Sequence, residues 1–296
     1  MDLDRFEEQR RRVTTPGGPV SYVDTGGPDA PPGPVALFVH GVGTSSYLWR
    51  KVIARVADDR RCIALDLPLH GGTPARPGQD FTLGGLATFV AGFCDTLGLP
   101  AIDLVANDTG GAVAQILAAR RPERLHTLTL TNCETHDNVP PRALRPVVWL
   151  ARAGLFAGMA HRASRDPARA RRTVYGPGYE NLDVLPLELV RRWQQPLVGD
   201  RGRAAELQRW LATMHPRDLP AAEPALAELR LPTLVVWGTG DRFFHRRWAG
   251  WLRDTIPGVR EVVEVPGGRL FFPDERPDDL AGPLRRHWQS VGATAS

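Results

Sequence analysis

The hydrophobic positions of the chain fall into short runs that alternate with helical patterns. The runs are rich in Val, Leu and Ile, and they predict strands over residues 20–25, 34–41, 61–68, 101–108, 125–132, 231–238 and 260–267. The segments between them have the spacing of helices, which we expect over residues 46–58, 82–97, 110–121, 245–255 and 278–290. Strands that are apolar on both faces and separated by helices are typical of a parallel sheet covered on both sides.

One long segment, residues 133–225, interrupts this alternation. It has helical patterns that carry Arg and Trp, broken by a turn-rich stretch at 175–186, and it has no convincing strand. We therefore predict an α/β core from residues 1–132 and 226–296, with a helical cap formed by residues 133–225. Ligands of open parallel sheets bind beyond the carboxyl ends of the strands, so the residues that follow each strand are the candidates for chemistry.

The stretch "ANDTG" (106–110) places Asp108 between a predicted strand and a predicted helix. Small residues on either side let the strand and the helix approach closely. The central residue is then forced into a strained conformation, with its side chain exposed above the sheet. The competing interpretation is an aspartate that only caps the following helix.

The order of motifs along the chain resembles the α/β-hydrolase fold, in the branch of haloalkane dehalogenases and epoxide hydrolases. An aspartate at the elbow is typical of that branch, and the resemblance spans most of residues 15–290 outside the insertion. The other motifs that carry it are "FVHGVGTSSYLWRKVI" (38–53), "LDLPLHGGTPARP" (65–77), "LPTLVVWGTGDRFF" (231–244) and "FFPDERPDDLAGPL" (271–284). The resemblance implies a mostly parallel, doubly wound sheet with a helical cap.

The resemblance also implies roles for individual residues. Asp108 would be the nucleophile and Asp241 the acid of the triad, while the backbone N–H groups of Val42 and Thr109 would stabilise an oxyanion. A carboxylate has a reference pKa near 3.9, so it is charged at neutral pH and attacks a saturated carbon without a base. Halides and epoxides are the substrate classes that suit such a nucleophile.

Four further residues are candidates for binding or positioning. His40 is expected to orient the loop after its strand. Asn132 aligns with an alternative acid position of some dehalogenases, where it would hydrogen-bond without carrying charge. Tyr175 and Tyr179 correspond to the two cap tyrosines with which epoxide hydrolases protonate the epoxide oxygen, although they could equally pack around a Gly-Pro turn.

The chain departs from the family pattern where the triad histidine is expected. That position is occupied by Leu270, beside Arg269, and neither side chain can act as a general base near pH 7. The loss of such a base costs about 10²–10⁴ in rate. The candidates to replace it are His245, four residues after Asp241, His136 and Glu134, which follow the sixth strand, and His70, in the loop after Asp66. His245 and His136 are preferred, and each of the four could instead be a surface or hydrogen-bonding residue.

A second departure concerns the halide. In many haloalkane dehalogenases an Asn follows the His-Gly pair and a Trp follows the nucleophile, and their N–H groups hold the departing halide. The chain has Val42 and Thr109 at these places. The favoured function is therefore a hydrolase of the epoxide hydrolase or dehalogenase type, acting on a small organic substrate with a relocated base. The alternatives are a lyase, dehydratase, isomerase or cyclase of specialised metabolism on the same scaffold, or an inactive relative.

Composition narrows the classes of partner. The net charge is +4, Lys51 is the only lysine, and the densest basic stretch (161–172) has no aromatic residues on which bases could stack, so no nucleic-acid partner is expected. No apolar run approaches the roughly 18 residues of a membrane span. We expect no membrane partner, no metal or cofactor, a small-molecule substrate, a cytoplasmic location and no signal peptide; a homodimer is compatible with the sequence. The three cysteines, which form no CxxC pair, are Cys62, Cys94 and Cys133.

Overall fold

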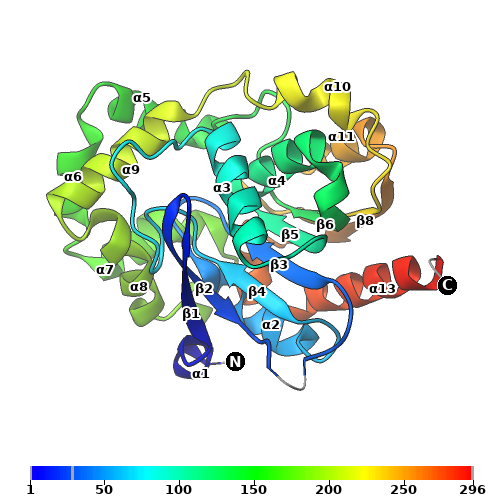
Figure 1. Cartoon of the computed structure of the whole chain (residues 1–296). Coiled ribbons are helices and arrows are strands. Elements are labelled where there is room, and N and C mark those ends of the chain that lie inside the picture. Colours follow the sequence, from blue (N-terminus) through cyan, green and yellow to red (C-terminus); the bar gives the residue numbers. More distant parts are fainter. Residues whose placement is uncertain (1, 28–29, 295–296) are drawn as a thin grey trace.

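The computed structural model describes residues 2–27 and 30–294, and its centre is an eight-stranded sheet (Figure 1). The strands lie in the order β1-β2-β4-β3-β5-β6-β7-β8. The β1–β2 and β2–β4 pairs are antiparallel and every later pair is parallel. The strands are β1 (Arg10–Thr15), β2 (Gly18–Asp24), β3 (Val35–Val39), β4 (Cys62–Leu65), β5 (Ile102–Asn107), β6 (Leu125–Thr131), β7 (Thr233–Gly238) and β8 (Val259–Val265).

All seven predicted strands are present, and the predicted fold class, a mostly parallel sheet covered by helices, is confirmed. The prediction missed β1. Its sequence, RRRVTT, is mostly polar and most of its residues are exposed or half-buried, because it forms an edge of the sheet. A search for apolar runs finds buried strands and overlooks a charged edge strand of this kind.

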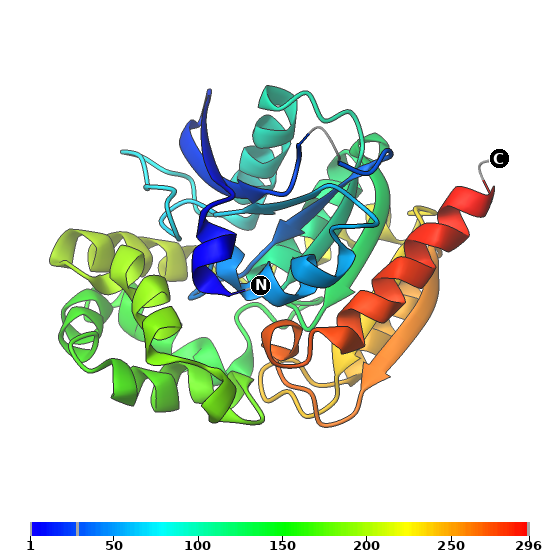
Figure 2. The same cartoon turned by 90° about the horizontal axis from the view of Figure 1, so that it is seen from below.

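Helices cover both faces of the sheet. Helices α2 and α13 pack on one face, while α3 and α4 pack on the other (Figures 1 and 2). The α-helices are α1 (Leu3–Glu7), α2 (Arg50–Val56), α3 (Leu83–Thr96), α4 (Thr109–Arg120), α5 (Arg145–Arg152), α6 (Phe156–Ala163), α7 (Pro167–Ala170), α8 (Leu187–Val198), α9 (Arg201–Thr213), α10 (Glu223–Leu226), α11 (Arg247–Thr255), α12 (Phe272–Glu275) and α13 (Asp278–Thr294). Short 3₁₀ and π turns are η1 (Ser46–Trp49), η2 (Pro122–Arg124), η3 (Arg142–Leu144), η4 (Arg171–Tyr175), η5 (Gly176–Gly178), η6 (Leu182–Val184) and η7 (Pro220–Ala222).

The segment between β6 and β7, all of which the structure describes, contains helices α5 to α10 and no strand. It lies beside the sheet in Figure 2 and reaches the loops at the carboxyl ends of the strands. The Tyr175 hydroxyl, for example, donates to the carbonyl of Gly43, which follows β3, at 3.0 Å. The division of the chain into a core and a cap domain stays a prediction.

Helix α4 begins so close to β3 that its second residue has no room for a side chain. A Cβ added to Gly110 would lie 2.5 Å from the carbonyl oxygens of both Val39 and His40. These are backbone atoms, which cannot swing away as a side chain would. A glycine at this position therefore lets the helix start directly above the sheet.

We expect the substitution Gly110→Ala to lower the free energy of unfolding by about 1–3 kcal/mol, because the added methyl forces a backbone shift. Urea unfolding measures this change. The matched control is Gly92→Ala in α3, where an added Cβ meets no atom within 4 Å. The control should leave stability unchanged or raise it by about 0.4–1 kcal/mol. Equal effects of the two substitutions would contradict the close approach of α4 to β3.

Candidate active site

Asp108 has the strained backbone that the sequence predicts for an elbow. Its φ of 55° and ψ of −138° lie at the junction of β5 and α4, in a region that non-glycine residues rarely adopt. Its N–H donates to the carbonyl of Asn132 at 2.9 Å, and its own carbonyl accepts from the Gly111 N–H at 2.8 Å. These bonds on both sides hold the residue in a conformation that it would otherwise leave.

The Asp108 side chain is directed at the loop that follows β3. A Cβ on Gly41 would overlap the Asp108 carboxylate, so the carboxylate lies directly over that glycine. The side chain makes no capping hydrogen bond to α4, which removes the interpretation of Asp108 as a helix cap. Only 4% of the residue is exposed, so the carboxylate is almost fully removed from bulk water.

A second carboxylate, Glu134, lies beside Asp108 and is completely buried. The Thr109 hydroxyl donates to Glu134 Oε1 at 3.1 Å. Gln115 Nε2 fixes the Glu134 backbone by donating to its carbonyl oxygen at 2.8 Å. Glu134 Oε2 has no hydrogen-bond partner among the described residues. A buried carboxylate oxygen without a donor strongly disfavours the charged form.

The two carboxyl groups oppose each other's ionisation. Burial raises the pKa of Asp108 well above its ordinary value, and the charges of Glu134 and Asp241 raise it further, while the Thr109 N–H acts in the opposite direction. Burial also raises the pKa of Glu134 to about 7. Neither carboxylate forms an ion pair with a cationic side chain in the described part of the chain. Two negative charges at once are therefore disfavoured, and we expect the pair to share a proton.

The predicted residues Asn132 and Asp241 lie together at the ends of β6 and β7. Asp241 accepts from Asn132 Nδ2 at 2.7 Å and from the Phe243 N–H at 2.7 Å. Asn132 also accepts from the Gly238 N–H at 2.7 Å, so its amide ties the two strand ends together. Burial raises the pKa of Asp241 to about 6. Asp241 thus borders the site, with Asn132 in place of an imidazole as its side-chain partner.

Leu270 occupies the place where the histidine of the triad is expected. Its side chain is buried, and its carbonyl accepts from Asn107 Nδ2 at 3.1 Å. The neighbouring Arg269 donates to the carbonyl of Tyr179 at 2.6 Å. An aliphatic side chain beside the elbow can pack there, but it cannot move a proton.

The structure does not bring either of the preferred histidines to Asp108. His245 is exposed, and its Nδ1 accepts from the Arg247 N–H at 3.1 Å, at the start of α11. His136 has a positive φ of 53°, which turns it towards α10, where its Nδ1 lies 2.5 Å from Glu223 Oε1. Both rings serve local surface structure, and we do not assign them to the site.

The two candidate tyrosines also have internal partners. Tyr175 is buried and donates to the Gly43 carbonyl, and Tyr179 donates to Asp274 Oδ2 at 2.8 Å. Burial raises the pKa of both hydroxyls. In this structure they therefore tie the segment around residues 175–179 to the core, and neither hydroxyl is directed at Asp108.

Two buried histidines stabilise the loop after β3, over which the Asp108 side chain lies. His40 Nε2 accepts from the Leu67 N–H at 3.0 Å, and its Nδ1 lies 2.8 Å from the Gly41 carbonyl. His70 Nε2 accepts from the Gly43 N–H at 3.2 Å. Burial lowers the pKa of both rings, so they are neutral. This arrangement agrees with the expectation that His40 orients the loop.

The backbone N–H of Val42 donates to no acceptor in the described part of the chain. Val42 follows Gly41, over which the Asp108 carboxylate lies. The Thr109 N–H is already directed at that carboxylate and stabilises its charged form. A role for both groups in holding an oxyanion stays a prediction.

Across residues 2–27 and 30–294, no cluster of three or more His, Cys, Asp or Glu side chains is placed to hold a metal ion. No helix in these ranges has the length and apolar character required to span a membrane. A cytoplasmic location and a homodimer stay predictions.

The site that emerges is a pair of buried carboxyls with a third carboxyl at its border. Sequence reasoning found Asp108 and Asp241, but on the segment after β6 it preferred His136 to Glu134. Glu134 could have been selected from its position just beyond the carboxyl end of β6, the strand adjacent to β5. A site of this kind can hold one proton and one negative charge together, which suits both nucleophilic and acid–base chemistry.

Comparisons with known proteins agree with this fold. The family described as alpha/beta hydrolase fold matches residues 34–276. The chain is 28% identical to haloalkane dehalogenase 2 of Mycobacterium tuberculosis, over 96% of each chain. It is 38% identical to a haloalkane dehalogenase of Mesorhizobium japonicum, but over only 40% of this chain and 36% of that protein. The solved structure of the epoxide hydrolase CorEH shares the fold, with a TM-score of 0.77 at 20% identity over 95% of this chain and 99% of the other.

The buried Glu134 predicts a pH dependence of stability. Burial raises its pKa from the ordinary 4.5 to about 7, so between these values unfolding releases a proton and the free energy of unfolding falls as pH rises. Glu134→Gln removes this dependence. As the pH rises from 4.5 to 8, the free energy of unfolding of the variant, relative to that of the wild type, should increase by about 3 kcal/mol. Urea unfolding across this range measures it, with the exposed Glu228→Gln as the control. If the difference in free energy of unfolding between Glu134→Gln and wild type does not change with pH, burial does not raise the pKa of Glu134.

Proposed function

Because the chain belongs to the alpha/beta hydrolase fold family, as a hydrolase of the haloalkane dehalogenase and epoxide hydrolase type, we propose that Asp108 is its nucleophile. The substrate is a small organic molecule with an electrophilic saturated carbon. The observation that supports this most strongly is the Asp108 carboxylate, which is strained, buried and directed over Gly41 instead of capping α4.

The first step uses the single charge of the carboxyl pair. When the shared proton lies on Glu134, Asp108 is charged and is stabilised by the Thr109 N–H. An Asp108 oxygen then attacks the carbon and forms an ester, while the bond from that carbon to the halide or epoxide oxygen breaks. Burial removes water from the carboxylate, which strengthens its interaction with the reacting carbon.

The second step, hydrolysis of the ester, lacks its usual base because Leu270 replaces the histidine. In the first step Glu134 gives its proton to the epoxide alkoxide, or releases it to solvent when a halide departs, which leaves Glu134 charged. We assign the proton of the attacking water to Glu134 Oε2, which has no other partner in the described structure. The N–H groups of Val42 and Thr109 would hold the oxyanion that forms on the ester. Glu134 is a less effective base for ester hydrolysis than a histidine at this position would be. We therefore expect the ester to persist.

The first test is intact-mass spectrometry after incubation with a terminal epoxide and with a primary alkyl bromide. The wild-type protein should gain the mass of one alkyl group, and Asp108→Asn should gain none, because an amide is a poor nucleophile. Asp241→Asn is the matched control and should still form the ester. Absence of any adduct, together with full activity of Asp108→Asn, would overturn the proposal.

The second test restores a base. In Leu270→His an imidazole returns to the position of the triad histidine, and hydrolysis of the ester should accelerate by about 10²–10⁴. The lifetime of the mass adduct measures this rate. Leu270→Asn is the control, because its side chain is polar and of similar size but is not basic. If the two variants hydrolyse the ester equally fast, the missing histidine is not what limits turnover.

A second candidate function follows from the other position of the shared proton. With the proton on Asp108, the residue is a general acid and Glu134 is the charged base, as a lyase, isomerase or cyclase requires. The raised pKa of Asp108 supports this alternative. It predicts that no adduct forms with any alkylating substrate, while both Asp108→Asn and Glu134→Gln abolish turnover.

A further inference from the structure

Exposed apolar side chains are concentrated in one part of the molecule. Over the described residues, the large hydrophobic side chains with more than half of their surface exposed all lie between residues 149 and 174. They are Trp149 (65%), Leu155 (55%), Met159 (58%) and Val174 (57%). Single exposed apolar residues are ordinary, but a group confined to one short stretch indicates a contact with something outside the fold.

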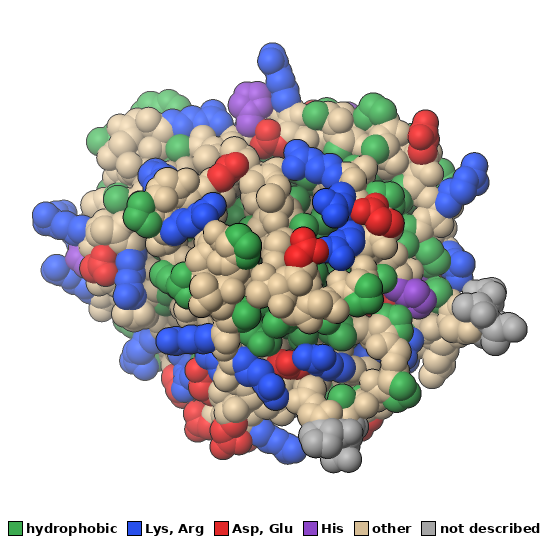
Figure 3. Space-filling model, viewed as in Figure 1, with side chains coloured by type: hydrophobic (Ala, Val, Ile, Leu, Met, Phe, Trp, Pro, Cys, Tyr) green, Lys and Arg blue, Asp and Glu red, His purple; other side chains and the backbone are tan. Residues whose placement is uncertain are grey.

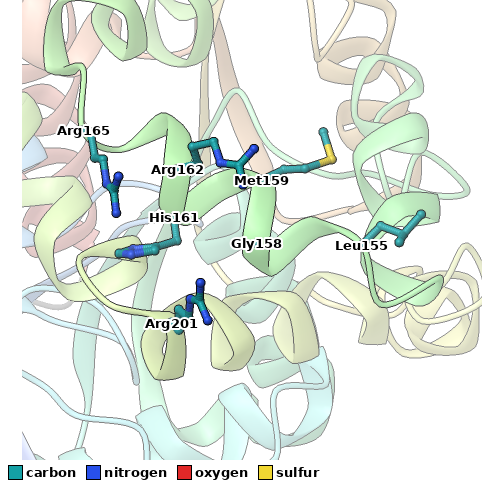
Figure 4. A pocket seen from close by; sticks show the side chains of 7 residues that line it. All are labelled: Leu155, Gly158, Met159, His161, Arg162, Arg165 and Arg201. Atoms are coloured by element: carbon teal, nitrogen blue, oxygen red, sulfur yellow. The ribbon is translucent and has the colours of Figure 1, made fainter.

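Two of these residues, Leu155 and Met159, line a hollow of about 500 Å³ between α6 and the start of α9. In Figure 4, Arg165 and Arg201 approach His161 from opposite sides, while Leu155 and Met159 lie towards the other end. The remaining lining residues are Gly158 and Arg162, so no carboxylate lines the hollow. The hollow therefore has a cationic end and an apolar end.

The arginines of this hollow have no counter-charge. Within the described structure, the guanidinium groups of Arg162, Arg165 and Arg201 form no hydrogen bond or ion pair, whereas most other arginines do. The nearest acids along the chain, Asp166 and Asp200, already cap α7 and α9. At the left edge of the face shown in Figure 3, near α6 in Figure 1, basic side chains outnumber the acidic ones that lie among them. Guanidinium groups that line the same hollow without an acid favour the binding of an anion.

We propose that this hollow binds an anion that carries an aliphatic tail. A carboxylate or phosphate head would lie between Arg165 and Arg201, and the tail would cover Leu155 and Met159. His161 keeps Nε2 available to the head group, because its Nδ1 lies 2.9 Å from the Val198 carbonyl. A second copy of the chain fits this surface less well, since it would present the same unpaired positive charges.

A ligand with this chemistry is either a free amphiphile or an anionic lipid of a membrane. A lipid source would revise the expectation that the chain has no membrane partner. The site is separate from Asp108 and does not depend on the function proposed above.

Binding of dodecyl phosphate below its micelle concentration tests the site, measured by titration calorimetry. The double variant Arg165→Gln/Arg201→Gln should bind about tenfold more weakly or worse, because each charge-assisted hydrogen bond to the head is lost. The matched control, Arg169→Gln/Arg172→Gln, removes two exposed charges that lie outside the hollow and should stay within about twofold of wild type. Inorganic phosphate alone should bind much more weakly than dodecyl phosphate.

The tail is tested by Leu155→Ser/Met159→Ser, which should weaken dodecyl phosphate binding but not inorganic phosphate binding, whereas Val174→Ser should change neither. Co-sedimentation with phosphatidylglycerol vesicles, against phosphatidylcholine vesicles, identifies the source. Binding that depends on Arg165 and Arg201 supports the site with a lipid ligand, and binding of dodecyl phosphate without vesicle binding supports it with a free one. The proposal is overturned if neither probe binds, if the Arg169/Arg172 control loses as much affinity, or if the hollow proves to be buried in a dimer.

Discussion

The burial of two neighbouring carboxyl groups, Asp108 and Glu134, governs the ionisation of this site. Burial alone disfavours both charges, and no cation in the described structure compensates them. One negative charge and one proton are therefore shared between two residues. In a site with a histidine, the imidazole would take up that proton, and the nucleophile would be permanently charged. Here the position of one proton decides whether Asp108 attacks carbon or donates an acid proton.

The fold creates this pair through its topology. Asp108 follows β5 and Glu134 follows β6, and these strands are parallel neighbours, so the residues beyond their carboxyl ends meet at one edge of the sheet. The close start of α4 above β3, which requires Gly110, forces the Asp108 side chain over Gly41. Asn132, which accepts the Asp108 N–H and binds Asp241, then connects the elbow to the end of β7. The three carboxyls are brought together by backbone geometry, with Asp108 and Glu134 buried and Asp241 half-buried at their border.

Sequence reasoning found what depends on apolar pattern and on local backbone strain. Apolar runs predicted seven strands, and small residues around Asp108 predicted its elbow. Both signals depend only on residues that are adjacent in the sequence. The charged edge strand β1 gave no such pattern. The segment "NCETH" after β6 carries one carboxyl and one imidazole, and only the backbone decides which of these two is buried. The positive φ of His136 turns that ring outwards to Glu223, which leaves Glu134 as the buried group.

A carboxyl-carbon NMR titration tests the shared proton most directly. It requires protein labelled with ¹³C at the Asp and Glu carboxyl groups, with Asp108→Asn and Glu134→Gln used to assign the signals. At pH 6 we predict that Asp108 and Glu134 together retain one proton, and that removing either residue shifts the titration of the other to lower pH. If both carboxyls are fully ionised at pH 6, and each titrates unchanged when the other is replaced, the two groups do not share a proton and the account of this site is wrong.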